Sequence, residues 1–197
     1  MKIFIFYSTC IFSEIISIGL KEALTLLEKA GVVFRVKHTS GNGLPLEAQA
    51  KENIFKTVFL DIGLMQNICG TSSDIFLTSN ENFIKANEGA LAEQFVAQEL
   101  LNYQDFYTQP SLYYWVREAK NSSAEVDYVI PCCSKAIPIE VKSGKTGTLK
   151  SMHLYLKKVN LSVGVKISML PFDYTFPIIS IPFYAIKKIP EFISNYV

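Results

Sequence analysis

Two stretches in the second half of the chain carry acidic residues at the alternating spacing of β-strands. "AEVDYVI" contains Asp127, and "IPIEVK" contains Glu140 and Lys142. If the two stretches form a hairpin that turns at residues 133–134, Asp127 lies opposite Glu140, and Glu125 lies opposite Lys142. Two opposed carboxylates repel each other unless a positive charge lies between them. The pattern therefore predicts a cation site on one face of a sheet, with an apolar set on the other face.

Magnesium, or manganese in its place, suits such a site because it prefers oxygen ligands and keeps several waters. Asp127 and Glu140 are the predicted metal ligands. Lys142 is placed to orient a metal-bound water and to offset the negative charge of a phosphodiester transition state. This combination of residue types predicts hydrolysis of phosphodiesters.

A third carboxylate is expected from a helix that begins near Glu88 and ends near Tyr103. At helical spacing, Glu93 shares a stripe with Val96 and Leu100, so it lies on or beside the face that packs on the sheet. A carboxylate in that place is costly unless it is paired or bound to metal. The predicted catalytic residues are Glu93, Asp127, Glu140 and Lys142, and the predicted metal ligands are Asp127, Glu140 and Glu93.

The same acidic stretch runs into Gly144, Lys145 and Thr146, which imitate the end of a nucleotide-binding phosphate loop. Such a loop needs a glycine five residues earlier, where this chain has Ile139. The spacing therefore argues against nucleotide binding, and we do not expect the chain to be an ATPase on its own.

Each functional reading has a simpler alternative. The four predicted catalytic residues could form an inert salt-bridge network, and Glu125 is either a further ligand or an ion-pair partner of Lys142. Lys145 and Lys150 are candidates for phosphate contacts but are more typical of solvated lysines. His153 is favoured as an ordinary helix residue, and the aromatic run at 113–115 as core rather than a base-stacking surface.

The elements that must position these residues follow from hydrophobic periodicity and turn signals. A helix is expected over residues 18–30 and ends at Gly31; with two lysines and two glutamates it favours packing or partner binding over DNA recognition. Strands follow at "VVFRVKHT" and "KTVFL", and Asp61 is placed to cap a helix that ends near Cys69. The second half predicts the helix from Glu88, three strands in a meander, a helix over 148–158 and two further strands.

The order helix, strand, loop, strand predicts a small winged-helix-like domain over residues 1–75. The earlier helices of such a domain would have to fit within the first 17 residues, which favours a truncated winged-helix domain. Residues 76–197 form the expected α/β domain, with a mixed central sheet flanked by helices.

Composition bounds the remaining classes. The chain has 197 residues, a formal charge of +1 and 49% hydrophobic residues, which predicts a substantial core and gives no overall basic footprint for nucleic acid. The four cysteines show no paired C-x-x-C spacing, and the apolar N-terminus is interrupted by Glu14. We therefore expect a cytoplasmic protein with no structural zinc, no secretion signal and no membrane partner; the oligomeric state is left open.

Gly89 and Glu93, then Asp127, then Glu140-Val141-Lys142 resemble the G-x-x-x-E, D and E-x-K series of the PD-(D/E)xK nuclease superfamily. More closely, the span from Leu20 to about Ile189 resembles the uncharacterised C-terminal region, a domain of unknown function, of bacterial and archaeal AAA-type ATPases. The stretches that carry this resemblance are "SGNGLPLEAQA", "KTVFLDIGL", "GALAEQFVAQEL", "AEVDYVI" and "IPIEVKSGKTGTLKS".

The resemblance implies a PD-(D/E)xK restriction-endonuclease-like core, separated from the ATPase domain that precedes it in that group. Two functions then compete. The first is a magnesium-dependent nuclease-like enzyme that hydrolyses DNA phosphodiesters. The second is a non-catalytic module that binds nucleic acid or a partner ATPase through a relic of the nuclease site.

Overall fold

The computed structural model describes residues 18–68, 81–105, 107–118, 124–144 and 148–196. Its strands are β1 (Val33–Thr39), β2 (Ala50–Phe59), β3 (Leu112–Val116), β4 (Glu125–Cys132), β5 (Lys135–Lys142), β6 (Gly164–Ser168) and β7 (Ile178–Pro182). Its helices are α1 (Ile18–Lys29), η1 (Glu47–Gln49), α2 (Ile62–Ile68), α4 (Glu81–Asn102), α5 (Lys150–Val159), η2 (Phe183–Lys188) and α6 (Ile189–Ile193).

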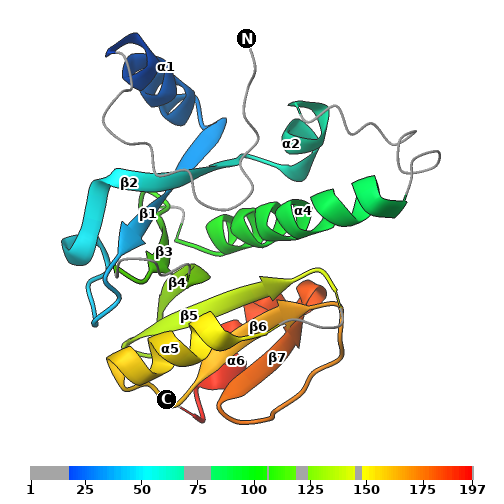
Figure 1. Ribbon diagram of the computed structural model, residues 1–197. Helices are drawn as coiled ribbons and strands as arrows, with labels where there is room; N and C mark the ends of the chain where they lie inside the picture. Colours follow the sequence, from blue (N-terminus) through cyan, green and yellow to red (C-terminus); the bar gives the residue numbers. More distant parts are fainter. Residues whose placement is uncertain (1–17, 69–80, 106, 119–123, 145–147, 197) are drawn as a thin grey trace.

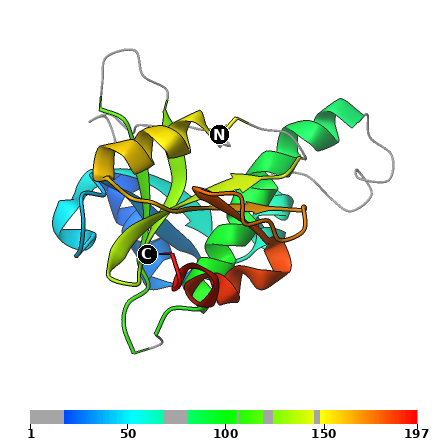
Figure 2. The ribbon, with the colours of Figure 1, turned by 90° about the horizontal axis from the view of Figure 1, so that it is seen from below.

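The strands form one seven-stranded mixed sheet in the order β2-β1-β3-β4-β5-β6-β7. The pairs β1–β3, β5–β6 and β6–β7 are parallel, and the other pairs are antiparallel. Helices flank both faces: α5 lies on one side of the sheet and α6 on the other (Figures 1 and 2). The main core cluster joins the sheet to residues of α4, η2 and α6, whereas α5 packs on smaller clusters. The mixed α/β prediction is confirmed.

The β4–β5 hairpin has the predicted turn and register. Cys133 and Ser134 have φ angles of 49° and 61°, the left-handed conformation that a tight two-residue hairpin turn requires. Tyr128 pairs with Ile139 and Cys132 with Lys135, so continuing this register brings Asp127 opposite Glu140. Beyond the turn, β5 is buried on both faces, which explains its nearly continuous apolar sequence.

The first part of the chain contains the predicted local elements in a different setting. Helix α1 ends before Gly31, whose φ is +69°, and the Asp61 carboxylate accepts a 2.9 Å hydrogen bond from the N–H of Leu64 to cap α2. However, β1 and β2 are strands of the seven-stranded sheet, because β1 pairs in parallel with β3. A separate winged-helix domain is therefore not confirmed. The expected boundary near residue 75 and the first 17 residues lie outside the described residues.

The glycine-rich loop after β1 is attached to the α5 side of the sheet by one buried tyrosine. The hydroxyl of Tyr155 lies 3.0 Å from the carbonyl oxygen of Gly41 and 3.2 Å from that of Ala136, so one O–H group serves two acceptors. Tyr155 also packs edge-on against Trp115, with ring centroids 5.3 Å apart. The backbone of Gly41 has a φ of +67°, and a Cβ there would lie 2.5 Å from the tyrosine hydroxyl oxygen.

Gly41→Ala is therefore expected to lower the free energy of unfolding by about 2–4 kcal/mol, since it adds steric overlap to left-handed backbone strain. Gly31→Ala is the matched control: its φ is +69°, and nothing lies within 4 Å of the added Cβ. We expect the control to cost about 1–2 kcal/mol. Urea unfolding of both variants measures the difference. If both variants lose the same free energy of unfolding, the Tyr155 side chain moves aside at no cost and the steric argument is wrong.

In the described part of the chain, no helix has the length and apolar character needed to cross a membrane.

Candidate active site

Asp127 lies where β4 departs from regular pairing. Tyr113 pairs with Val129 and Trp115 with Val126, so β4 has one more residue than β3 between these two pairs. Asp127 and Tyr128 occupy this bulge, a feature that re-aims side chains and is common beside active sites. The Asp127 carboxylate accepts a 2.7 Å hydrogen bond from the N–H of Val141 on β5. Asp127 is thereby held against the strand that carries Glu140.

Glu140 and Lys142 form an ion pair on β5. Lys142 Nζ lies 2.7 Å from Glu140 Oε1, and the Glu140 side chain is only 8% exposed. Glu140 Oε2 is buried and has no hydrogen-bond partner among the described residues. Burial, followed by repulsion from Asp127, raises the pKa of Glu140 to about 7. Burial alone would lower the pKa of Lys142, but the hydrogen bond and charge of Glu140 raise it above its ordinary value.

Glu93 reaches the same cluster from α4. The helix packs on the sheet through the predicted stripe, since Val96, Ala97 and Leu100 are buried in the main core. The hydroxyl of Tyr128 donates a 3.0 Å hydrogen bond to the carbonyl oxygen of Glu93 and ties this turn of α4 to the bulge. Burial, followed by repulsion from Asp127, raises the pKa of Glu93 to about 7.

Two further residues belong to the cluster. Lys56 on β2 was not predicted; its ammonium lies 2.7 Å from Glu125 Oε1. The charges of Asp127 and Glu93 also act on Lys56 and, with Glu125, raise its pKa although burial opposes this. Among the described residues, the ion-pair partner of Glu125 is therefore Lys56 and not Lys142, the partner that the sequence suggested. A single lysine within a strand has no local signal that distinguishes it from a solvated one.

The cluster as a whole has excess negative charge. Glu93, Glu125, Asp127 and Glu140 face the ammonium groups of Lys56 and Lys142, which leaves two negative charges when all six groups are ionised. Burial also raises the pKa of Asp127, against the opposing charge of Lys56 and the hydrogen bond from Val141. The excess equals the charge of one divalent cation, which the hard oxygen donors here would suit.

The chemistry of these donors fits magnesium or manganese, and Glu140 Oε2, which has no partner in the described part of the chain, has a free ligand position. In the part of the chain that the structure describes, no group of three or more acidic, histidine or cysteine side chains lies close enough together to hold a metal ion by itself. The positive charge at the cluster comes instead from the two lysines.

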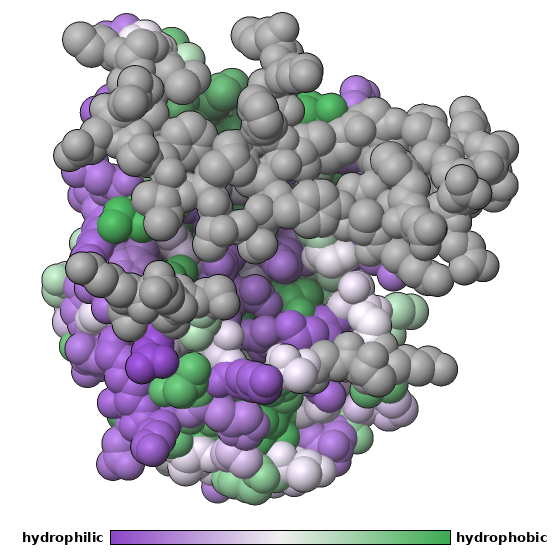
Figure 3. Space-filling model, in the orientation of Figure 1, coloured by the Kyte–Doolittle hydropathy of each residue, from purple (hydrophilic) through white to green (hydrophobic). Residues whose placement is uncertain are grey.

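The other candidate residues do not take part in the contacts of the carboxylate cluster described above, or they lie outside the described residues. Lys145 is not described, whereas Lys150 and His153 are exposed on α5. The region of α5 is mostly hydrophilic in the orientation of Figure 1 (Figure 3). Tyr113 and Trp115 are buried in the core, at 6% and 2% exposure, so they are not a surface for base stacking.

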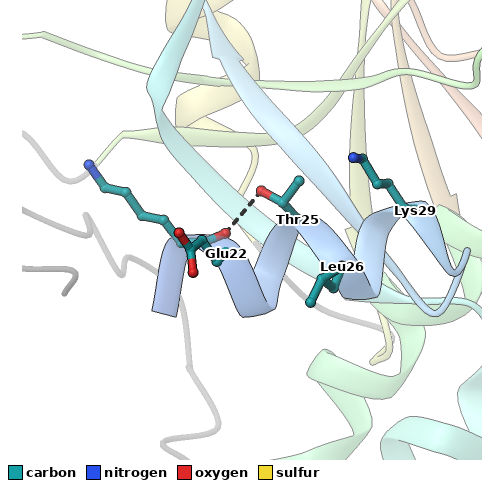
Figure 4. A pocket seen from close by; sticks show the side chains of 5 residues that line it. Glu22, Thr25, Leu26 and Lys29 are labelled. Atoms are coloured by element: carbon teal, nitrogen blue, oxygen red, sulfur yellow. Dashed lines mark hydrogen bonds between the residues drawn. The ribbon is translucent and has the colours of Figure 1, made fainter. Parts of the chain in front are cut away.

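A separate hollow lies along α1, and the described residues that line it all belong to that helix (Figure 4). Its lining contains positively charged lysine and negatively charged glutamate side chains. The hydroxyl of Thr25 donates a 2.9 Å hydrogen bond to the carbonyl oxygen of Lys21 within the helix. Leu26 beside it is 66% exposed. The hollow shares no residue with the carboxylate cluster and has no converging polar groups that would recognise a ligand.

Comparison with known proteins assigns the chain to a protein family. No curated protein and no solved structure matches the chain. Residues 88–186 match a family described as Domain of unknown function (DUF4143), and this span covers half of the chain. It contains all four residues predicted as catalytic, Glu93, Asp127, Glu140 and Lys142, but not Lys56. The chain therefore belongs to the family Domain of unknown function (DUF4143).

Proposed function

We propose that this chain is a magnesium- or manganese-dependent nuclease-like enzyme that hydrolyses DNA phosphodiesters. The observation that carries the proposal is the convergence of carboxylates from α4, β4 and β5 beside Lys142, with Glu140 Oε2 buried and unpartnered. Buried carboxyl groups with strongly raised pKa values are uncommon outside functional sites. The resemblance to PD-(D/E)xK nucleases supports the same reading.

Asp127 and Glu140 would hold the metal ion, and Glu93 would assist as a further ligand or through a bound water. When bound, the metal supplies a more acidic water and stabilises negative charge on the phosphate. Lys142 already lies against Glu140, so its ammonium is placed to orient the attacking water and to interact with the phosphate oxygens. Asp127 keeps the position set by its hydrogen bond to the backbone of Val141.

A second function is supported by the ion pairs themselves. Lys56 pairs with Glu125 and Lys142 with Glu140, so much of the cluster is neutralised by the protein alone. A non-catalytic module that binds nucleic acid or a partner ATPase would need no more than this. We place this function second because it leaves the buried oxygen of Glu140 without a role.

The deciding experiment measures cleavage of labelled single-stranded, duplex and branched DNA with MgCl₂ or MnCl₂, and with EDTA as the blank. Wild type is compared with Glu140→Ala and Lys142→Ala. Lys188→Ala is the matched control, since Lys188 is an exposed lysine paired with Glu191. We expect cleavage that needs metal, survives in the control and is lost in both site variants. No cleavage of any substrate, together with no heat of Mn²⁺ binding in calorimetry, would support the interaction module instead.

A further inference from the structure

Lys56 lies outside the span that carries the predicted site, yet it forms an ion pair with one carboxylate of the cluster, Glu125. It belongs to β2, which is separated from β4 in the sheet by β1 and β3. Its Nζ nevertheless lies 2.7 Å from Glu125 Oε1 on β4. The Lys56 ammonium also lies 4.9 Å from the ring centroid of Tyr114 and 5.6 Å from that of Tyr128. These aromatic faces favour a cation in this place.

The Lys56–Glu125 pair is sheltered from water. The side chains are 24% and 14% exposed, unlike those of Lys51 and Glu118, a pair that also begins on β2 and is 46% and 60% exposed. A sheltered ion pair loses more when one partner is removed, because the remaining charge stays unpaired in a poorly solvated place. Lys56 is therefore not equivalent to a surface lysine of the same strand.

The strand that carries Lys56 is fastened to the helix that carries Glu93. The side-chain amide of Gln94 accepts a 2.9 Å hydrogen bond from the N–H of Phe59 and donates a 2.8 Å hydrogen bond to its carbonyl oxygen. Gln94 is buried and adjoins Glu93, while Phe59 is near Lys56 on β2. This contact fixes the ammonium relative to the carboxylate of α4.

The two lysines of the cluster pair with carboxylates on different strands. Lys142, the lysine of the E-x-K-like motif, pairs directly with Glu140 on β5, whereas Lys56 on β2 pairs directly with Glu125 on β4.

We propose that Lys56 is the internal counter-ion of the carboxylate cluster, a positioning residue that holds Glu93, Asp127 and Glu125 together in the metal-free protein. The consequence for metal binding rests on the proposed function: Lys56 and a divalent cation are alternative sources of positive charge for the same carboxylates. Removing Lys56 leaves the cluster with a larger negative excess, so the stability of the protein then depends on added metal.

The test is thermal unfolding of the full chain at pH 8 in EDTA. We expect Lys56→Met, which keeps an unbranched side chain and removes the charge, to unfold at least about 5 °C below wild type. Lys51→Met is the matched control and is expected to lie within about 2 °C of wild type. If Lys56→Met unfolds no earlier than Lys51→Met, the counter-ion role is overturned.

A double variant keeps the test decisive if Lys56→Met folds poorly. Lys56→Met/Glu125→Gln removes one carboxylate with the lysine and restores the original charge excess, so we expect it to recover at least half of the lost unfolding temperature. A double variant no more stable than Lys56→Met alone would also overturn the proposal. Lys56→Arg keeps the positive charge and is expected to remain closer to wild type than Lys56→Met.

Repeating the measurement with MnCl₂ separates this inference from the proposed function. We expect Mn²⁺ to raise the unfolding temperature of Lys56→Met more than that of wild type, because the metal replaces the missing charge. If Mn²⁺ stabilises neither protein while the differences in EDTA stand, the metal-dependent function fails and the counter-ion role is retained. If Mn²⁺ stabilises both equally, the proposed alternation between lysine and metal is overturned.

Discussion

Glu140→Gln is expected to lower the rate of metal-dependent DNA cleavage by at least about 100-fold, while the protein stays folded. Glutamine preserves the shape of the side chain and removes the charge of a carboxylate that is 8% exposed. It also replaces one carboxylate oxygen with an NH₂ group, which offers no lone pair to a cation. Because burial raises the pKa of Glu140 to about 7, the wild-type protein holds this charge at a cost near neutral pH, and glutamine relieves that cost.

Two measurements on the same preparations check this expectation. The first is the initial rate of cleavage with saturating MnCl₂, and the second is the urea midpoint at pH 8 in EDTA. Glu191→Gln is the matched control, since Glu191 pairs with Lys188 on the surface, where the side chains are 65% and 54% exposed. We expect the control to keep its cleavage rate and its midpoint. A Glu140→Gln variant that cleaves at the wild-type rate would remove Glu140 from the site.

The stability of the metal-free protein is expected to fall as pH rises from about 4.5 to above 7. Burial and mutual repulsion raise the pKa of Glu93 and of Glu140 to about 7, against 4.5 for an ordinary glutamate. In this window the folded state holds more protons than the unfolded state, so the stability present below pH 4.5 is lost as pH rises through 7. Each carboxyl alone would account for about 3 kcal/mol, and the two titrate together rather than independently.

His38 gives the opposite slope in part of the same window. Burial lowers its pKa, so its folded state favours the neutral ring and gains stability as pH rises toward 6.5. The informative quantity is therefore the difference between wild type and Glu140→Gln, because both proteins contain His38. We expect this difference to grow between pH 5 and pH 8 in favour of Glu140→Gln, as measured by urea unfolding in EDTA. A difference that stays constant with pH would show that Glu140 has an ordinary pKa.

Saturating MnCl₂ should reduce the same pH dependence if the proposed metal site forms, since a bound cation favours the ionised carboxylates. The unfolding series repeated in metal thus links the stability of the cluster to its proposed chemistry.

Local signals in the sequence determined most of the helices and strands, the register of the β4–β5 hairpin and the side of α4 on which Glu93 lies. The alternation of apolar and polar residues and a turn at Cys133 and Ser134 set the hairpin register, because a slip of one residue would exchange the faces of the sheet on which Ile139 and Glu140 lie. Helical spacing placed Glu93 on the stripe that packs on the sheet. Gly31 and Asp61 ended and began helices as predicted, since both act through backbone groups within a few residues.

Other features were decided only by the tertiary structure. The pairing of β1 with β3 joins Val36 to Leu112 across the chain, and no periodicity within either segment specifies such a partner. The bulge at Asp127 depends on the register of β4 against β3, which a β4–β5 hairpin pattern does not contain. The position of Lys56 against Glu125 was decided in the same way, because the folded sheet, together with the contact between Gln94 and Phe59, brings β2 beside α4. Residue types and local spacing therefore predict which carboxylates could share a cation, whereas long-range strand pairing decided that Lys56 lies against Glu125.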